Sequence, residues 1–384
     1  MPRIKNTILI FSLLLFFSCV KAFDPQIDNT AVSKYVISGR VTNIEGWQEV
    51  EVSLSSPVES PKYIPVQGCQ GRIQDNKGND FELTQFEPGL YKVWMGQADL
   101  TPGTSYRIQI TTPDGDLLES SFDTMFKCPR LDSVYYAIEV IPTSNPAISQ
   151  EVMQFYVDLN AEGDYSRYYK WDVIETWEYH AAHPFEYYYD GAMHQIDPPD
   201  YTNKVCWITG LSKNVFTLST KSLTQNKYRQ YPLQRIDGKT SRLGIMYSIL
   251  VRQLALSEKA YNYWEQMRIN SNEQGGLYEK QPLAIKGNLL NMSNPEKVVL
   301  GCFYASSESA RRYFYHDVAG IKLTFYNFCS EESLGMFGWR EFFKWEYPIY
   351  FYYNEVGALR ILNKECIDCR LLGGTIVKPD FWPN

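Results

Sequence analysis

The stretch VEVSL at Val50–Leu54 alternates apolar and polar side chains without a break, and YRIQI at Tyr106–Ile110 repeats the pattern. Successive side chains of a strand point to opposite faces of its sheet. A period of two is therefore typical of strands that bury one face and expose the other. The two stretches predict a sheet that covers a core with one side.

Turn sequences separate the strands predicted around these two stretches. They are DNKG at Asp75–Gly78, EPG at Glu87–Gly89 and PDG at Pro113–Gly115. Glycine adopts positive φ and proline presets its own φ, so both residues are frequent in tight turns. Short strands at this spacing predict an antiparallel β-sandwich over residues 34–128, of the prealbumin- or immunoglobulin-like kind.

A second β-rich domain is predicted over residues 129–384, after the boundary sequence CPR at Cys128–Arg130. It contains one predicted helix, near residues 257–274, with Ser257 as N-cap and Gly275-Gly276 as the stop. The helix is amphipathic, and the stripe expected to face the sheet is Ala260, Tyr261, Trp264, Met267 and Arg268. The predicted fold class is mainly β with one prominent helix.

The first nineteen residues have the pattern of an export signal. Arg3 and Lys5 precede the apolar run Ile8–Phe17, which as a helix would span about 15 Å, too short to cross a bilayer. Residues 1–18 are predicted to be a lipoprotein signal peptide, and Cys19 is predicted to carry the lipid anchor. Residues 19–33 lack periodicity and are predicted to form a tether. The alternative is an ordinary cleaved signal in which Cys19 is incidental.

The charge of the chain limits its partners. The formal net charge is −7, and no basic stripe follows the leader, which argues against nucleic acid as a partner. No later apolar run approaches the roughly eighteen residues that a membrane-spanning helix needs. Membrane attachment is therefore expected through lipid on Cys19.

Cysteines are expected to form disulfides, because an exported chain meets an oxidising compartment. The candidates are Cys69, Cys128, Cys206, Cys329, Cys366 and Cys369. We expect Cys69 to pair with Cys128 and the other four to pair among themselves, although spacing does not fix the connectivity. Seven cysteines remain besides Cys19, so at least one stays unpaired, and Cys302 is the expected buried thiol.

Aromatic residues are dense between Tyr168 and Trp207. One interpretation is a sheet with aromatic pairs between its strands. The other is a platform on which a flat ligand such as a sugar stacks, with Tyr187, Tyr188, Tyr189 and Trp177 as the candidate ligand-binding residues. Three adjacent tyrosines on one strand cannot all face one core, which is why the second interpretation is kept.

The sequence offers little catalytic chemistry. His180 and His183, with His194 nearby, form the one metal-like cluster, but Pro184 interrupts the helix that such a pair would need. Cys366-x-x-Cys369 has the spacing of a redox motif, yet no βαβ pattern surrounds it, so a structural disulfide is favoured. We therefore predict a non-enzymatic protein with no catalytic residue, no metal and no cofactor.

Several short sequence motifs occur in the same order as in one protein family. They are LALSE at Leu254–Glu258, GGLY at Gly275–Tyr278, LGCF at Leu300–Phe303, the terminal Cys366-x-x-Cys369, and PDFW at Pro379–Trp382. The order resembles the Bacteroidota outer-membrane lipoproteins grouped as domain of unknown function forty-two forty-nine. Members of that family are often encoded beside TonB-dependent receptors.

The resemblance implies a lipid-anchored outer-membrane protein that faces the cell surface and serves a TonB-dependent transporter. Its expected work is ligand capture or stabilisation of the transporter's outer face. The alternative is a surface module that binds a glycan or host polymer through Tyr187–Tyr189 without any transporter.

Overall fold

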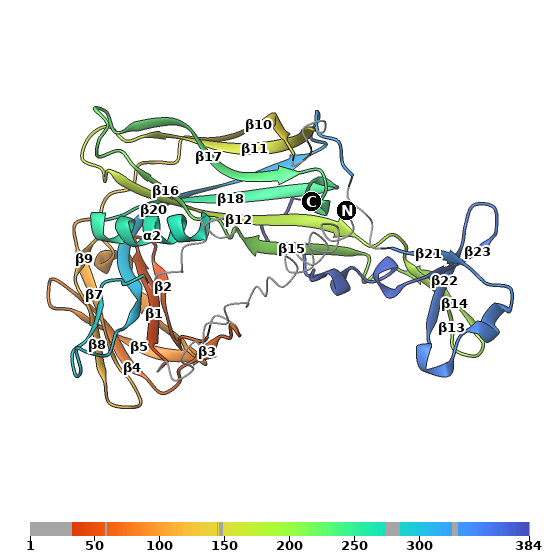
Figure 1. Ribbon diagram of the computed structural model, residues 1–384, viewed down its shortest axis with the longest axis horizontal. Coiled ribbons are helices and arrows are strands. Elements are labelled where there is room, and N and C mark those ends of the chain that lie inside the picture. Colours follow the sequence, from red (N-terminus) through yellow and green to blue (C-terminus); the bar gives the residue numbers. More distant parts are fainter. Residues whose placement is uncertain are drawn as a thin grey trace, which may run out of the picture.

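The computed structural model describes residues 33–57, 60–143, 145, 149–272, 285–324 and 329–383. The predicted leader, Cys19 and residues 20–32 of the tether lie outside the described residues. The described chain is mainly β with a single α-helix, α2 (Glu258–Asn272), which confirms the predicted fold class (Figure 1). No helix in this part of the chain has the length and apolar character to cross a bilayer.

The N-terminal region is a sandwich whose two layers enclose one core. Val50 and Val52 are fully buried there beside Ile108 and Ile110, as the alternation predicts. One layer contains β1 (Tyr35–Thr42), β2 (Gly46–Leu54), β6 (Leu90–Met95), β5 (Asp80–Glu87) and the short β3 (Ile64–Pro65). The other contains β4 (Gln70–Asp75), β7 (Ser105–Thr111), β8 (Leu117–Ser120), β9 (Asp123–Thr124) and β19 (Leu289–Asn291).

Strand β20 (Leu300–His316) joins the sandwich to the rest of the molecule. Its first half runs parallel to β1, with Val36 opposite Leu300. Its second half pairs antiparallel with β18 (Met246–Ala255). Because β20 pairs with strands of both regions, one continuous sheet runs from the N-terminal sandwich into the second region. Phe303, on the parallel half, is fully buried in the core of the N-terminal sandwich.

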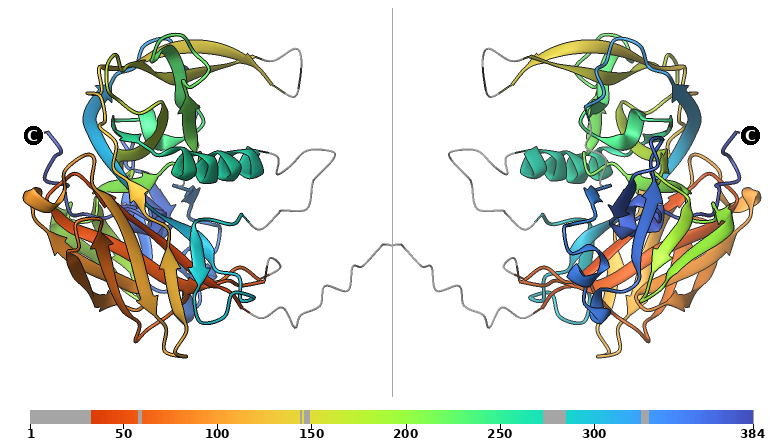
Figure 2. Two further views of the ribbon diagram at one scale, coloured as in Figure 1. Left: turned by 90° about the vertical axis from the view of Figure 1, so that its left-hand side faces the viewer. Right: turned by 90° about the vertical axis from the view of Figure 1, so that its right-hand side faces the viewer.

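The second region is also built of two layers. One is the continuation of the large sheet, with β18, β20, β12 (Tyr168–His180), β15 (Val205–Leu211) and β16 (Phe216–Ser219). The other is β10 (Ser133–Pro142), β11 (Ser149–Asn160) and β17 (Lys227–Asp237). Aromatic rings fill the core between the layers, where Phe155 stacks on Tyr247 with ring centroids 5.9 Å apart. Figure 2 shows this three-stranded layer and the N-terminal sandwich on opposite sides of the molecule.

Helix α2 covers the other face of the large sheet. The Ser257 hydroxyl accepts a hydrogen bond from the Ala260 N–H at 3.1 Å, which confirms the predicted N-cap. Ala260 is buried against Leu254, and the Tyr261 and Trp264 side chains pack on the same cluster. The predicted stop at Gly275-Gly276 lies outside the described residues.

A third sheet, of five strands, stands apart from the other two at one end of the long axis (Figure 1). We call residues 184–200 and 329–362 the aromatic lobe. The lobe also contains two short 3-10 helices, η4 (Gly338–Glu341) and η5 (Lys344–Glu346). In spatial order its strands are β14 (Met193–Asp200), β13 (Phe185–Tyr189), β22 (Ile349–Tyr353), β23 (Leu359–Leu362) and β21 (Glu331–Ser333).

Candidate functional site

The three predicted tyrosines lie on β13, in the middle of the aromatic lobe, and they alternate between its faces. Tyr187 stacks on Phe351 of the neighbouring strand β22, with ring centroids 5.3 Å apart. Tyr189 stacks on Trp339 of η4 at 4.3 Å. Tyr188 instead stacks on His194 of β14 at 4.6 Å. Each tyrosine is half-buried, so the rings serve first as packing within the lobe.

Beside these stacked rings the lobe exposes a second set of large apolar side chains. We call residues 336–345 the apolar segment. Its exposed members are Met336 (94% exposed), Phe337 (73%), Phe343 (63%) and Trp345 (79%). The rings of Phe343 and Trp345 lie nearly parallel, 7° between planes and 5.6 Å between centroids. The segment therefore presents large side chains to solvent in an ordered arrangement.

Backbone hydrogen bonds to carboxylates shape the apolar segment. The Phe337 N–H donates to Glu341 at 3.0 Å, and the Phe343 N–H donates to Glu346 at 2.6 Å. Each carboxylate closes one 3-10 turn, and the aromatic side chain of the residue that donates the hydrogen bond is exposed to solvent. Contiguous exposed apolar groups rimmed by polar ones are typical of protein interaction sites. No periodicity marks this segment in the sequence, although its density of Phe, Met and Trp is a visible signal.

Trp177 does not belong to this site. It lies on β12 in the large sheet and packs against the core of the second region. The Arg242 guanidinium lies 5.8 Å from its ring centroid, which covers the indole further. The structure therefore separates Trp177 from the three tyrosines with which the sequence analysis grouped it.

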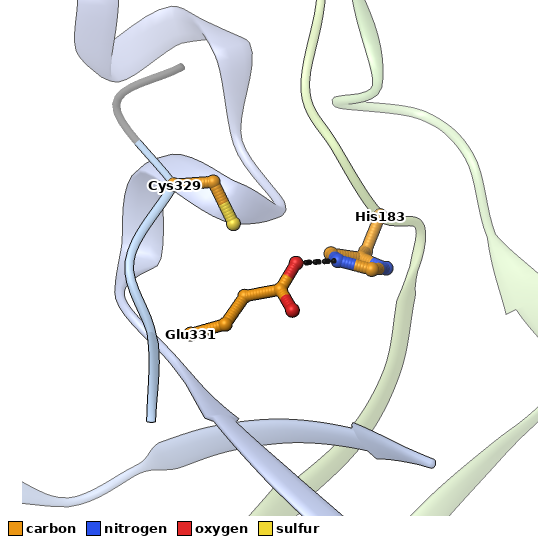
Figure 3. A group of neighbouring side chains, drawn as sticks. All are labelled: His183, Cys329 and Glu331. Carbon is orange, nitrogen blue, oxygen red and sulfur yellow. Dashed lines mark hydrogen bonds and ion pairs between the residues drawn. The ribbon is translucent and has the colours of Figure 1, made fainter. Parts of the chain in front are cut away.

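The three predicted histidines do not converge on one point. Each forms its own pair with a carboxylate: His180 with Glu178 at 2.6 Å, His183 with Glu331 at 3.1 Å, and His194 with Asp190 at 2.9 Å. Within the described ranges, the one group of three potential metal ligands is His183, Cys329 and Glu331, whose ligand atoms lie within 4.8 Å of one another (Figure 3). Cys329 is bonded to Cys366, and a disulfide sulfur is not the thiolate that metals bind.

Four of the predicted cysteines form two disulfides, Cys206–Cys369 and Cys329–Cys366. The two cysteines of the C-x-x-C motif are therefore not bonded to each other, and each forms a disulfide with a cysteine earlier in the chain. Cys369 attaches the C-terminal segment to β15, whereas Cys366 attaches it to the start of β21 in the lobe. Together the bridges fasten the lobe to the rest of the molecule.

The expected pairing of Cys69 with Cys128 is wrong, because both residues are free thiols. Cys69 is buried in the core of the N-terminal sandwich, where its N–H donates to the Tyr91 hydroxyl at 3.0 Å. Cys128 packs against the core of the second region. The two thiols thus belong to different cores. Cys302 is a buried free thiol, as predicted.

A charged cleft of about 500 Å³ lies between the N-terminal sandwich and the second region, and the sequence analysis did not anticipate it. Arg40 of β1 donates to Asp172 of β12 at 2.8 Å, and Lys170 also pairs with Asp172. The Lys170 ammonium lies 4.2 Å from the ring centroid of Trp264 on α2. The Arg40–Asp172 pair therefore links the two regions across the cleft.

The fold and the site define a mainly β protein with a linked pair of sandwiches and an outlying aromatic lobe. The family model described as "Domain of unknown function (DUF4249)" matches residues 20–312, and the chain belongs to this family. That match confirms the resemblance inferred from the short sequence motifs. It ends before residue 313, so β21–β23 and the apolar segment follow the matched part of the chain.

Comparison with curated proteins gave no match. Among solved structures, the crystal structure of trypsin-activated alpha-2-macroglobulin from Escherichia coli is similar at 11% identity, with a TM-score of 0.20. The likeness covers 59% of this chain and 15% of that one. At that TM-score it supports no conclusion about fold or function.

Proposed function

We propose that the protein is a non-enzymatic, lipid-anchored outer-membrane protein that serves a TonB-dependent transporter and contacts the transporter's outer face through the aromatic lobe. In this proposal, lipid on Cys19 holds the protein at the membrane, and the lobe supplies the contact. Membership of the DUF4249 family supports the proposal, because the resemblance to that family implies an outer-membrane lipoprotein that serves a TonB-dependent transporter.

The observation that carries the proposal is the exposed apolar segment. Its residues include Met336, Phe343, Trp345 and the charged Arg340. Aromatic residues, Met and Arg are the types enriched at protein–protein interfaces. Exposing such side chains to water is unfavourable by roughly 25 cal/mol per Å² of apolar area, and a protein partner would remove that cost.

Purification from native membranes in mild detergent tests the proposal. We compare the unchanged protein with the double variant Phe343→Ala/Trp345→Ala and with the control Trp47→Ala/Trp94→Ala. Trp47 and Trp94 form another exposed aromatic pair, on β2 and β6 of the N-terminal sandwich. A transporter should co-purify with the unchanged protein and the control but not with the lobe variant. A protein that comes out alone contradicts the proposal.

The second candidate function is glycan binding by the lobe without a transporter. It is favoured by Tyr187, whose hydroxyl accepts a hydrogen bond from the Gln195 side-chain amide at 3.1 Å beside the stacked ring of Phe351. An aromatic face next to an amide is an arrangement that a sugar can use. Pull-down of the soluble protein on polysaccharides tests it, and this candidate fails if alanine variants of Tyr187–Tyr189 bind unchanged.

A further inference from the structure

The Cys329–Cys366 disulfide lies beside His183 and Glu331, two side chains of types that bind metals. Reduction of the disulfide would add two thiols to them. His183 Nε2 is 3.1 Å from a Glu331 carboxylate oxygen, and Cys329 Sγ lies within 4.8 Å of a ring nitrogen of His183 and a carboxylate oxygen of Glu331. Cys366 Sγ is bonded to Cys329 Sγ. One nitrogen, one oxygen and the Cys329 sulfur therefore gather at one place (Figure 3), and the Cys366 sulfur is bonded to that of Cys329.

Contacts independent of the disulfide hold the nitrogen and oxygen ligands in place. The backbone N–H of His183 donates to the Cys366 carbonyl at 2.8 Å, and the imidazole packs on the Tyr352 ring at a tilt, with 4.0 Å between centroids. The Tyr352 hydroxyl donates to Glu331 at 2.7 Å. Such support is what orients metal ligands in known sites.

The spacing of these atoms suits zinc. Zinc–sulfur bonds of about 2.3 Å and zinc–nitrogen or zinc–oxygen bonds of about 2.0–2.2 Å place tetrahedral ligand atoms roughly 3.3–3.8 Å apart. The 3.1 Å between His183 and Glu331 is close to that range, and Cys329 Sγ lies within 4.8 Å of a ligand atom of each, so small side-chain movements would bring the three together around an ion. Two cysteines, a histidine and a carboxylate are all zinc ligands.

We propose that reduction of the Cys329–Cys366 disulfide creates a Zn²⁺ site whose ligands are Cys329, Cys366, His183 and Glu331. The disulfide takes up two electrons and two protons to give two thiols. With a phosphine as reductant, the phosphine becomes its oxide with an oxygen atom from water. Zn²⁺ then displaces both thiol protons to the buffer. Zinc would thereby replace the covalent link between the lobe and the C-terminal segment.

The second disulfide provides an internal control. Cys206 and Cys369 are fully buried in an apolar cluster with Tyr179 and Ala181. Within the part of the chain that the structure describes, no metal-ligand group includes either of them. Reduction there should give two thiols with no nitrogen or oxygen ligand beside them, and hence no tight zinc site.

Zinc titration against a chromophoric chelator tests the proposal on the full mature chain, reduced with a phosphine or left oxidised. The variants are Cys329→Ser/Cys366→Ser, the control Cys206→Ser/Cys369→Ser, and the double substitution His183→Gln/Glu331→Gln. We expect one Zn²⁺ per reduced chain and at least about 100-fold weaker binding by the oxidised chain. The control variant should retain the site, and the other two variants should lose it.

Cobalt substitution distinguishes a site of defined tetrahedral geometry from non-specific binding by thiols elsewhere in the chain. Co²⁺ in the reduced protein should give the thiolate charge-transfer bands and strong visible bands of a tetrahedral site, because two sulfurs coordinate the ion. The His183→Gln/Glu331→Gln variant keeps all of the cysteines, so loss of the spectrum there reports on the non-sulfur ligands. A reduced chain that binds no zinc, or equal binding by Cys329→Ser/Cys366→Ser, overturns the proposal.

Discussion

Arg40 on β1 donates a 2.8 Å hydrogen bond to Asp172 on β12, across 132 residues of sequence. Both side chains are largely buried, and Lys170 contacts the same carboxylate. Burial alone would raise the pKa of Asp172, but Lys170 and Arg40 outweigh burial and hold that pKa below its ordinary value. The ionised carboxylate is therefore one of the groups that join the N-terminal sandwich to the second region.

Asp172→Asn should destabilise the protein by about 2–3 kcal/mol at pH 7, because Lys170 loses its carboxylate partner and Arg40 is left with the more distant Glu308, at 3.9 Å. The pKa of Asp172 is lowered in the folded state, so its contribution is present above the unfolded pKa of about 3.9 and is lost as pH falls through the folded pKa. Urea unfolding from pH 7 to pH 3 should show the difference between the two proteins shrinking at the acidic end.

The control for this prediction is Asp80→Asn, which removes one partner of the more exposed Arg72–Asp80 pair. It should cost less than about 1 kcal/mol at any of these pH values, because solvent screens exposed pairs. Equal losses for Asp172→Asn and Asp80→Asn would show that the pair at Arg40 does not join the two regions.

Gly301→Ala should prevent normal pairing of β20 with β1. Gly301 has a φ of 94°, and a Cβ atom there would lie 2.0 Å from the Ile37 carbonyl oxygen. Both the backbone conformation and the contact exclude a side chain, so we expect a loss of about 3 kcal/mol or more. Gly210→Ala is the control, because nothing lies within 4 Å of its added Cβ. Similar melting temperatures for the two variants would contradict this close approach.

Cys69, Cys128 and Cys302 should resist alkylation in the native protein at pH 8. Burial raises the pKa of the Cys128 and Cys302 thiols to about 12 and raises that of Cys69 as well. Peptide mass spectrometry should find these three labelled only after denaturation, whereas the other four cysteines of the described chain should require a reductant too. A Cys69–Cys128 linked peptide would contradict the disulfide pattern.

The apolar segment should contribute little to folding. Phe343→Ala/Trp345→Ala removes exposed rings and should change the free energy of unfolding by less than about 1 kcal/mol. Phe351→Ala, in contrast, removes a buried ring that stacks on Tyr187 and should cost about 3–5 kcal/mol. Thermal unfolding of both variants checks this. A large loss in the first variant would assign the segment to packing and not to binding.

Local features of the sequence predicted the parts of the fold that depend on local physics. Val50 and Val52 are buried because a strand repeats every two residues, and Ser257 caps α2 because its hydroxyl reaches an N–H three residues on. The parallel pairing of β1 with β20 joins segments more than 250 residues apart, and no periodicity indicates such a pairing. The place of Phe303 in the first core was therefore not predictable.

The candidate site was predicted only in part for the same reason. Tyr187–Tyr189 were identified because three adjacent rings on a strand must face both sides. Trp177 was grouped with them by proximity in sequence, but β12 turns it toward a different core. The pairing of Cys69 was misjudged because spacing carries no information on which core encloses each thiol. Exposure of the apolar segment depends on the turns closed by Glu341 and Glu346.

Photo-crosslinking from position 345 in intact cells tests the proposed docking surface most directly. Trp345 is replaced by a photoreactive phenylalanine analogue, with Trp47 replaced in the same way as the control. We predict that the lobe position crosslinks to a TonB-dependent transporter, identified by mass spectrometry, and that position 47 does not. Absence of transporter peptides from position 345, or equal crosslinking from both positions, would contradict docking through the aromatic lobe.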